Sequence, residues 1–342
     1  MGFNIKHINR YWRWCKEHYK CYRDNCKINR HYAKLCLDLD IALLRQLPDK
    51  EIDKFAMRKH KWVLRYIEER IPETIKKYND MPAPSNLFEP NPDVKVWSMW
   101  WQGEENADPL FRMCIDSARR HTGHEVITLS KDNYSKYFEI PEFILEKHRE
   151  GKIALQHICD LMVMSIMAAE GGVFTGATVW WSQDVDDVFL KSPFFVCKAE
   201  TQSKYLISRS RWVGYFMIGN KEFPLFSFVR DCLHEYWRKC DQAIDYLMMD
   251  YIFELAYRNI PCVKKMIDEL PDNNLLRNEL INVLSEPYDP KTFKKYTEGD
   301  TWLYKLSWKF GKKKIFTEDK RITNYGHMLE ECTFWPRSKD EL

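Results

Sequence analysis

Hydrophobic and polar positions follow a helical period over most of the first 80 residues. Residues 35–47 (LCLDLDIALLRQL) carry the densest apolar face, and residues 51–79 form a charged amphipathic segment. Proline interrupts this pattern mainly at Pro48 and Pro72. We therefore expect residues 1–80 to form an N-terminal helical segment.

A proline-rich stretch ends the helical pattern. Residues 81–93 (MPAPSNLFEPNPD) contain four prolines, which favour a stiff, non-helical chain. We expect this connector to be a domain boundary. The main domain is expected over residues 94–320, followed by a C-terminal tail over residues 321–342.

Beyond the connector, short apolar runs typical of strands alternate with amphipathic segments typical of helices. This alternation predicts an α/β fold with a mainly parallel sheet covered on both faces, in which ligands bind at the carboxyl ends of the strands. The expected strands are residues 94–101, 125–130, 173–181, 204–208 and 214–218. The expected helices are residues 109–121, 141–149, 154–170, 225–239 and 243–257.

Residues 161–181 (LMVMSIMAAEGGVFTGATVWW) are apolar enough to suggest a membrane span. Glu170 and the Gly171-Gly172 pair interrupt the run near its middle, and the β-branched and aromatic residues after them favour a strand. We expect a buried helix followed by a central strand.

The composition favours a folded cytosolic protein with reduced cysteines. Hydrophobic residues make up 45% and charged residues 30% of 342 residues, which excludes a disordered chain. No apolar run typical of a secretory signal follows Met1, so the eleven cysteines are expected to be thiols. The irregular spacing of Cys15, Cys21 and Cys26 argues against a zinc site. The KDEL sequence at 339–342 is expected to be a coincidence.

Positive charge concentrates at the N-terminus, although the net charge is only +3. Residues 1–34 hold nine lysines and arginines against two acids, interleaved with seven aromatic residues. This pattern suits the headgroup region of an anionic membrane, so we expect peripheral attachment at the inner membrane face. A solvated helix face and non-specific nucleic-acid contact stay open, and no motif indicates a specific nucleic-acid partner.

The segment 153–181 combines polar and small residues in a pattern that can carry chemistry. His157 and Asp160 lie one turn apart on the expected helix, beside an apolar stripe that core packing requires. The Gly171-Gly172 pair allows a sharp turn and a close approach to the backbone. An Asp on a helix is otherwise usually a solvated residue.

This segment resembles the core of the capsular polysaccharide synthesis glycosyltransferases, which are related to the DxD sugar transferases of GT-A fold. The resemblance lies in QHICD (156–160), EGGVF (170–174) and ATV (177–179), and extends in order over roughly residues 90–310. Further matching blocks are VW (96–97), WWQGEE (100–105), KDNY (131–134), IP (140–141), WVGYFM (212–217), DY (245–246) and DY (250–251).

The resemblance implies a GT-A-like, Rossmann-type mixed sheet flanked by helices. It also implies a nucleotide-diphosphate sugar donor, a divalent cation (Mn²⁺ or Mg²⁺), and hexosyl-type transfer to a glycan or lipid-linked acceptor. A divalent cation would neutralise the charge of the leaving diphosphate.

The resemblance further implies roles for individual residues. Asp160 is expected to be catalytic by orienting the donor sugar, and Asp250 as a second metal-binding or acceptor-side carboxylate. Trp97 or Trp101 would stack the nucleotide base, although either can equally be a core residue. The other donor-binding candidates are Gln102, Gly103, His157, Gly171, Gly172 and Thr178.

Two positions depart from the family pattern. The family has Asp-x-x-Arg on the helix, but Val163 replaces the Arg and its bidentate fork. The family also has an Asp directly before Ala-Thr, where Gly176 offers no metal ligand. The metal ligands are therefore unknown, with Asp250 as a candidate, because Asp184 and Asp186 are more typical of a charged loop. Both an active transferase and a catalytically degenerate nucleotide-sugar or glycan-binding partner in polysaccharide assembly stay open.

Overall fold

Five short strands form the central sheet, in the order β2-β1-β3-β6-β5. The computed structural model describes residues 19–201, 203–308 and 314–334. Strands β2, β1 and β3 run parallel, β6 runs antiparallel to β3, and β5 runs antiparallel to β6. Strands β4 and β7 form a separate antiparallel pair. The strands are β1 (Val96–Met99), β2 (Val126–Leu129), β3 (Gly172–Thr175), β4 (Val179–Trp181), β5 (Phe194–Val196), β6 (Phe216–Gly219) and β7 (Leu303–Lys305).

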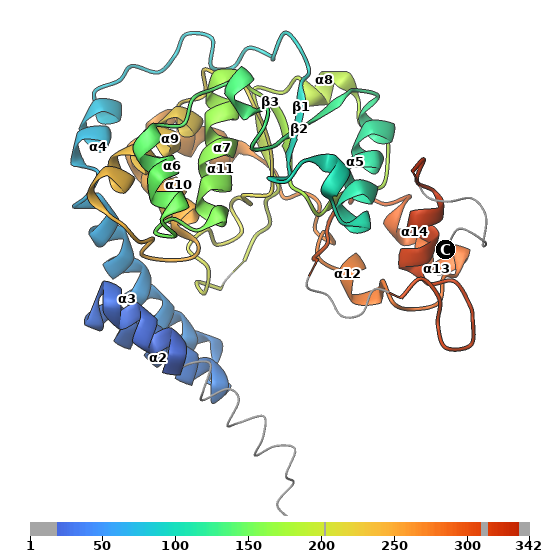
Figure 1. Ribbon diagram of the computed structural model, residues 1–342, viewed down its shortest axis with the longest axis horizontal. Helices are drawn as coiled ribbons and strands as arrows, with labels where there is room; N and C mark the ends of the chain where they lie inside the picture. The colour runs from blue at the N-terminus through green and yellow to red at the C-terminus, as the bar shows by residue number, and fades with distance from the viewer. Residues whose placement is uncertain (1–18, 202, 309–313, 335–342) are drawn as a thin grey trace, which may run out of the picture.

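Helices cover both faces of this sheet, and α2 and α3 form a long helical pair at one side of the molecule (Figure 1). The α-helices are α2 (Arg30–Leu44), α3 (Asp49–Glu68), α4 (Pro72–Asn79), α5 (Pro109–Thr122), α6 (Glu142–Arg149), α7 (Leu155–Ala169), α8 (Asp187–Leu190), α9 (Pro224–Lys239), α10 (Met248–Asn259), α11 (Pro261–Glu269), α12 (Leu280–Val283), α13 (Pro290–Phe293) and α14 (Asn324–Glu330). Short 3-10 turns are η1 (Glu104–Asn106), η2 (Tyr134–Lys136) and η3 (Lys294–Tyr296).

The two faces of the sheet enter different hydrophobic clusters because neighbouring strand residues point to opposite sides. Trp97 and Met217 belong to the main core, which also contains buried side chains of α7, α9 and α10. Val96 and Phe216 belong to a second cluster with side chains of α5, β4 and β7. A third cluster, away from the sheet, includes Trp180 and residues of α12 to α14. The mixed α/β architecture expected from the sequence is confirmed.

The turn from α7 into β3 depends on two glycines with positive φ. Gly171 has φ 69° and Gly172 has φ 95°, a region that residues with a Cβ rarely adopt. A Cβ on Gly172 would lie 2.4 Å from the carbonyl oxygen of Lys95, and one on Gly171 would lie 2.7 Å from the backbone nitrogen of Lys221. The glycines therefore let neighbouring backbone segments approach β3 closely.

The substitution Gly172→Ala should lower the free energy of unfolding by at least about 2 kcal/mol, since it combines a disfavoured φ with a backbone clash. Gly151→Ala is a matched control, because Gly151 has φ 74° but a Cβ added there would meet no atom within 4 Å. The control should cost only about 1 kcal/mol. Urea unfolding of both variants checks this, and equal losses would contradict the proposed clash.

The N-terminal helices share the main core with the α/β domain. Tyr32, Val63 and Ile67 lie in the same cluster as buried residues of α7 and α9. The backbone nitrogen of Thr74 donates to a carboxylate oxygen of Glu235 on α9, at 2.9 Å. The proline connector therefore joins two parts that pack together. Residues 1–18 of the expected segment lie outside the described residues.

Several predicted elements differ from the observed ones. The expected strand 173–181 is broken into β3 and β4 by a turn at residues 176–178, where the Gly176 nitrogen donates to the Tyr215 carbonyl oxygen at 2.8 Å. Residues 204–208 form turns instead of a strand. The helix expected from residue 243 begins only at Met248, because residues 243–247 form a turn. Strands β5 and β7 were not predicted, since their three-residue runs are too short to show alternation.

The C-terminal tail expected from residue 321 is folded as far as the structure describes it. The isolated bridge Phe316–Ile322 and helix α14 lie in this region, and Tyr325 and Met328 are buried in the third cluster. No helix in the described part of the chain is long and apolar enough to cross a membrane. Residues 161–181 form the end of α7 followed by β3 and β4, which confirms a buried helix followed by strand.

Candidate functional site

The carboxyl edge of the sheet brings together five chain segments, one of which follows the end of β5. Strands β1, β2 and β3 end at this edge, and the antiparallel strand β6 begins there. The residues that follow or precede these strand ends are Trp100 and Trp101, Ser130, Gly176 to Thr178, and Tyr215. Because α7 turns back into β3 within two residues, the first turns of α7 lie at the same end of the sheet.

Asp160 lies in the first half of α7 and is largely withdrawn from solvent. Its side chain is 13% exposed, and its Oδ2 atom lies 3.5 Å from Nδ1 of His157, one turn earlier. Burial raises the pKa of Asp160, while the neighbouring His157 ring acts in the opposite direction. The His157 ring in turn lies 5.8 Å from that of Trp237. Asp160 is therefore a mostly buried acid that lies against His157, and not a solvated surface residue.

Asp250, in the first turn of α10, is the second acid of the site. Its Oδ1 atom accepts a hydrogen bond from Nε1 of Trp212 at 2.9 Å. Burial raises the pKa of Asp250 to about 6, and the negative charges of Asp160 and Asp245 act in the same direction. The structure thus brings the two predicted catalytic residues, from α7 and α10, close enough for one carboxylate to influence the other.

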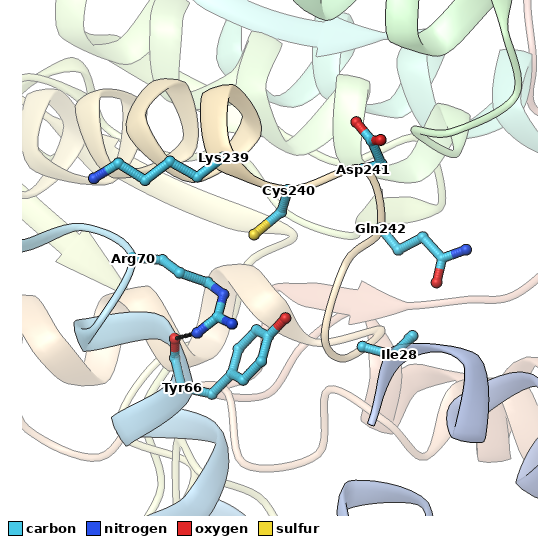
Figure 2. A pocket seen from close by; sticks show the side chains of 7 residues that line it. All are labelled: Ile28, Tyr66, Arg70, Lys239, Cys240, Asp241 and Gln242. Atoms are coloured by element: carbon cyan, nitrogen blue, oxygen red, sulfur yellow. Dashed lines mark hydrogen bonds between the residues drawn. The ribbon is translucent and has the colours of Figure 1, made fainter. Parts of the chain in front are cut away.

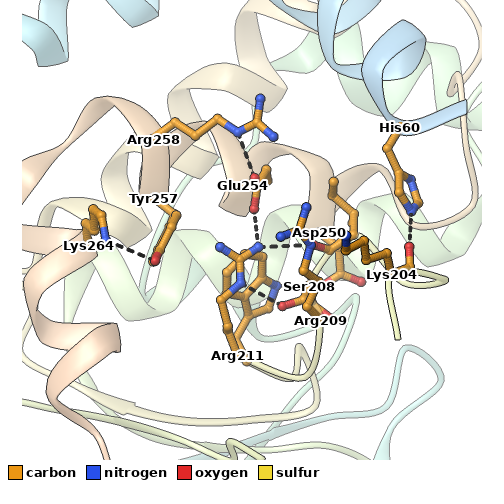
Figure 3. Close-up of polar contacts among 12 residues, drawn as sticks. His60, Lys204, Ser208, Arg209, Arg211, Asp250, Glu254, Tyr257, Arg258 and Lys264 are labelled. Carbon is orange, nitrogen blue, oxygen red and sulfur yellow. Dashed lines mark hydrogen bonds and ion pairs between the residues drawn. The ribbon is translucent and has the colours of Figure 1, made fainter. Parts of the chain in front are cut away.

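An ion-pair network behind Asp250 fixes Trp212. Arg211 pairs with Glu254, which also accepts from Nε of Arg258 at 2.7 Å. The Arg211 guanidinium lies 4.4 Å from the centre of the Trp212 ring, in a cation–π arrangement. Figure 3 shows how the two arginines converge on Glu254 beside Asp250. Trp212 is therefore held in the orientation in which it donates to Asp250.

The aromatic residues around β1 fall into two groups. Trp97 is completely buried, and its Nε1 atom donates to the carbonyl oxygen of Gly171 at 2.9 Å. The prediction that Trp97 stacks a nucleotide base is therefore wrong, because strand pleating directs its ring into the core. Trp101 is half-buried at the carboxyl edge, with its ring stacked on that of Tyr134 at 6.5 Å. Base stacking by Trp101 stays a prediction.

Gln102 and Gly103 continue from Trp101 at the same edge. The Gln102 side chain is exposed, and the backbone carbonyl oxygen of Gln102 accepts a hydrogen bond from Nδ2 of Asn106 at 2.9 Å. Gly103 has φ 90°, and a Cβ there would lie 2.2 Å from the Glu105 carboxylate. Donor binding by these two residues stays a prediction.

Gly171 and Gly172 lie at the opposite, amino edge of β3. The space that a Cβ would fill at either position is taken by the protein's own backbone. These glycines shape the turn from α7 into β3, so the prediction that they contact the donor does not fit this geometry. The sequence correctly indicated that another group approaches these glycines closely, but it could not show that this group is the protein's own backbone.

Asp184 and Asp186, which together form a DxD sequence, have structural partners instead of a shared metal site. Asp184 is 91% exposed and pairs with Nδ1 of His121 at 2.8 Å. Asp186 caps α8, with its carboxylate accepting from the Val188 nitrogen at 2.7 Å. The expectation of a charged loop is confirmed.

A lysine from β7 contacts the turn that holds Gly176 in place of the family's acidic residue. Gly176 begins this turn, and the Thr178 hydroxyl accepts a hydrogen bond from Nζ of Lys305 on β7 at 2.6 Å. No group of three or more His, Cys, Asp or Glu side chains within the described residues could hold a metal ion. A divalent cation at this turn would face the Lys305 ammonium and no carboxylate from the turn itself. The residues present therefore do not fit the metal that the resemblance implies.

Val163 and Asp250 also show whether the family's donor-binding and metal-binding groups are present here. Val163 is 4% exposed within the main core, so the position that the family gives to Arg is apolar here. Asp250 has too few metal-ligating side chains near it, among the described residues, for the metal-binding role that was predicted for it. The acceptor-side role of Asp250 stays a prediction.

Two cavities lie away from the carboxyl edge. One, of about 260 Å³, lies where α3 meets the end of α9, and its lining residues converge in Figure 2. Tyr66, Arg70 and Lys239 line it. The other, of about 650 Å³, runs along α3 between cationic side chains that include Arg58 and Arg65. Neither cavity contains a predicted site residue.

The predictions for the basic N-terminus are only partly covered by the structure. Cys15 and the charged residues before Tyr19 lie outside the described residues, and so does the KDEL sequence. Cys21 and Cys26 are free thiols, as are the other described cysteines. Contact of residues 1–34 with an anionic membrane surface stays a prediction.

Sequence reasoning missed three residues at the site. Trp212 was part of a matching block, and its place four residues before a strand could have suggested a role. The other two are Lys305 and Arg277, a buried arginine whose carbonyl oxygen accepts from the Lys305 nitrogen at 2.7 Å. They gave no signal, because they lie far from Thr178 in the chain and only the β4–β7 pairing brings Lys305 there. Lysine and arginine are common on protein surfaces, so their neighbours in the sequence alone do not mark them as site residues.

Comparisons with known proteins were consistent with the resemblance seen in the sequence. The family model described as "Capsular polysaccharide synthesis protein" matches residues 45–325. No curated protein matches the chain. Among solved structures, a chain titled "PaToxG Glycosyltransferase" aligns with a TM-score of 0.39 and 11% identity, covering 61% of this chain and 82% of that one. This last likeness is too distant to support an argument. The family match starts between α2 and α3 and not at the proline connector. This agrees with the packing of α3 into the same hydrophobic core as α7 and α9.

Proposed function

Because this chain belongs to the capsular polysaccharide synthesis protein family, we propose that it is a glycosyltransferase that takes its sugar from a nucleotide-diphosphate donor. The acceptor in this proposal is a glycan or a lipid-linked glycan. The observation that carries the proposal is the pair of mostly buried acids, Asp160 and Asp250, at the end of the sheet where α/β enzymes bind ligands.

The two acids suit different tasks. Asp160 is fixed on α7 and can accept hydrogen bonds from hydroxyl groups of the donor sugar, which would hold the anomeric carbon in place. Asp250, whose pKa is raised by burial to about 6, is ionised near neutral pH yet basic enough to accept a proton. Trp101 at the same edge offers an aromatic surface for the nucleotide base.

In the proposed transfer, an oxygen of the acceptor hydroxyl forms a bond to the anomeric carbon of the donor sugar. The bond between that carbon and the β-phosphate oxygen breaks, and the nucleoside diphosphate leaves with the bonding electrons. Asp250 takes the proton of the acceptor hydroxyl. Since the Gly176 turn does not fit a divalent cation, no step of this scheme uses one.

Hydrolysis of the donor is the most direct test of this function. We expect the full-length protein to release nucleoside diphosphate from at least one of a panel of UDP- and GDP-sugars, with water in place of the acceptor. Asp160→Asn should reduce the rate at least about tenfold, because it weakens the hold on the sugar. Absence of hydrolysis and of transfer to lipid extracts, for every donor in the panel, would contradict the proposal.

A second candidate function is that of a non-catalytic partner that binds a nucleotide sugar or glycan during polysaccharide assembly. The observation that favours it is the absence of a carboxylate at Gly176 together with the buried Val163 in place of the family's Arg. Saturable donor binding without hydrolysis or transfer would support this candidate over the first.

A further inference from the structure

Lys305 occupies an unusual place for a lysine. It lies on β7 at the carboxyl edge, is mostly buried, and donates to the Thr178 hydroxyl at 2.6 Å and to the Leu306 carbonyl oxygen at 2.7 Å. Its ammonium also lies 5.5 Å from the centre of the Tyr215 ring. An ammonium group has three protons to donate, so these two hydrogen bonds leave one direction for a further acceptor.

A second cation lies beside it. Arg277 is 6% exposed, and its carbonyl oxygen accepts from the backbone nitrogen of Lys305 at 2.7 Å. Its guanidinium donates to the Asn274 carbonyl oxygen at 3.2 Å, while its Nε atom is buried without a hydrogen-bond partner. The guanidinium also lies close enough to influence Tyr215 and Cys197, which both lie at the carboxyl edge.

No carboxylate balances these two charges in the described part of the chain. Neither Lys305 nor Arg277 forms an ion pair there, although most other buried cations do, for example Lys59 with Asp245. Burial lowers the pKa of Lys305, and no carboxylate raises it again. Two adjacent, mostly buried cations without a counter-ion are costly unless an anion joins them.

We propose that Lys305, backed by Arg277, binds the diphosphate of the donor and thereby replaces the divalent cation in this protein. The assignment rests on the function proposed above. The diphosphate is the part of a nucleotide sugar whose charge two cations match, and it must lie between the sugar and the base. Lys305 reaches the turn at Gly176, where the family pattern has its acidic residue, so a cation of the protein stands where a metal ligand would otherwise be.

The loss of the acid and the gain of the cation fit together physically. An Asp at position 176 would add a carboxylate to the same turn as Thr178, and its Cβ would lie 2.9 Å from the Tyr215 carbonyl oxygen. With Gly176, the turn leaves the ammonium without a competing carboxylate. The diphosphate oxygens would accept from the third Lys305 proton in a charge-assisted hydrogen bond. Arg277, whose Nε atom is buried, would add its positive charge from behind Lys305.

Calorimetric titration of the full-length protein with UDP, GDP and inorganic pyrophosphate tests the assignment. We expect at least one nucleoside diphosphate to bind with the same Kd, within about twofold, in EDTA and in Mn²⁺. Lys305→Met keeps the length and apolar stem of the side chain and should weaken binding at least about tenfold. Lys305→Arg keeps the charge and should retain most of the affinity.

Lys294→Met is the matched control, since Lys294 is 63% exposed and pairs with Glu298 on the surface. This variant should bind as the unaltered protein does. Circular dichroism shows whether each variant is folded. The comparison between EDTA and Mn²⁺ needs only the unaltered protein, so it decides the question even if Lys305→Met does not fold.

The outcomes separate the inference from the proposed function. Binding that requires Mn²⁺, or full affinity in a folded Lys305→Met variant, overturns the inference while donor hydrolysis can still support a glycosyltransferase. Binding in EDTA without hydrolysis supports the inference and points to the non-catalytic candidate. Absence of diphosphate binding in both buffers, together with absence of hydrolysis, overturns both.

Discussion

The substitution Asp250→Asn is expected to lower the rate of donor hydrolysis or sugar transfer about 100-fold or more while making the folded protein more stable above pH 7. The loss of rate follows because an amide cannot take the proton of the acceptor hydroxyl. The amide can still accept the hydrogen bond of Trp212, which the Asp250 Oδ1 atom accepts at 2.9 Å, so the local structure should persist.

The gain in stability follows from the direction of the pKa shift. Burial raises the pKa of Asp250 to about 6 from its ordinary value of 3.8, so the folded protein binds more protons than the unfolded chain between about pH 4 and 6. The free energy of unfolding therefore falls as the pH rises through this window. Above it, the ionised carboxylate costs up to about 3 kcal/mol, which Asp250→Asn removes.

Urea unfolding at pH 4 and pH 8, combined with a pH–rate profile, checks both parts of this prediction. The rate of the unaltered protein should fall as the pH drops below about 6, where Asp250 becomes protonated. Asp93→Asn serves as the control, because Asp93 is exposed and outside the site. A variant at position 250 that keeps its activity, or that is less stable at pH 8, would remove Asp250 from the proposed mechanism.

The second large effect is expected from Asp245→Ala, which should lower the free energy of unfolding by about 3–5 kcal/mol. The Asp245 carboxylate accepts from the Tyr32 hydroxyl at 2.8 Å and from Nζ of Lys59 at 2.6 Å, so it ties α2 and α3 to the turn before α10. Burial alone would lower the pKa of Lys59, whereas the Asp245 charge raises it. Without Asp245, an 18% exposed ammonium loses its partner.

Two comparisons make this prediction specific. The double variant Lys59→Met with Asp245→Leu should recover much of the stability, because no unpaired charge stays buried. Asp268→Ala should have a far smaller effect, since the pair of Asp268 with Lys264 lies at the surface. Urea unfolding and limited proteolysis of α2 and α3 provide the measurements. Equal losses for Asp245→Ala and Asp268→Ala would contradict the role of Asp245 as an anchor.

Asp160 and Asp250 could be proposed from the sequence, but the side chains around them could not. The family resemblance pointed to Asp160, and the α/β alternation predicts that the start of the helix before β3 lies at the carboxyl edge. Trp97 and Trp101 are four residues apart, a spacing that would put both rings on the same face of a continuous strand. Only the end of β1 at Met99 decides that one is core and the other lies at the edge. Lys305 could not be found, because its proximity to Thr178 depends on pairing between segments far apart in the chain.

The helical pair α2–α3 has a practical meaning for anyone who shortens this protein. Cutting at the proline connector would remove Tyr32 and Lys59 together and leave the Asp245 carboxylate bare, five positions before Asp250. The Asp245 charge, which already acts to raise the pKa of Asp250, would then have no counter-ion. A fragment trimmed to the sheet and its flanking helices should therefore differ from the whole protein in its pH–rate profile, even if it stayed folded.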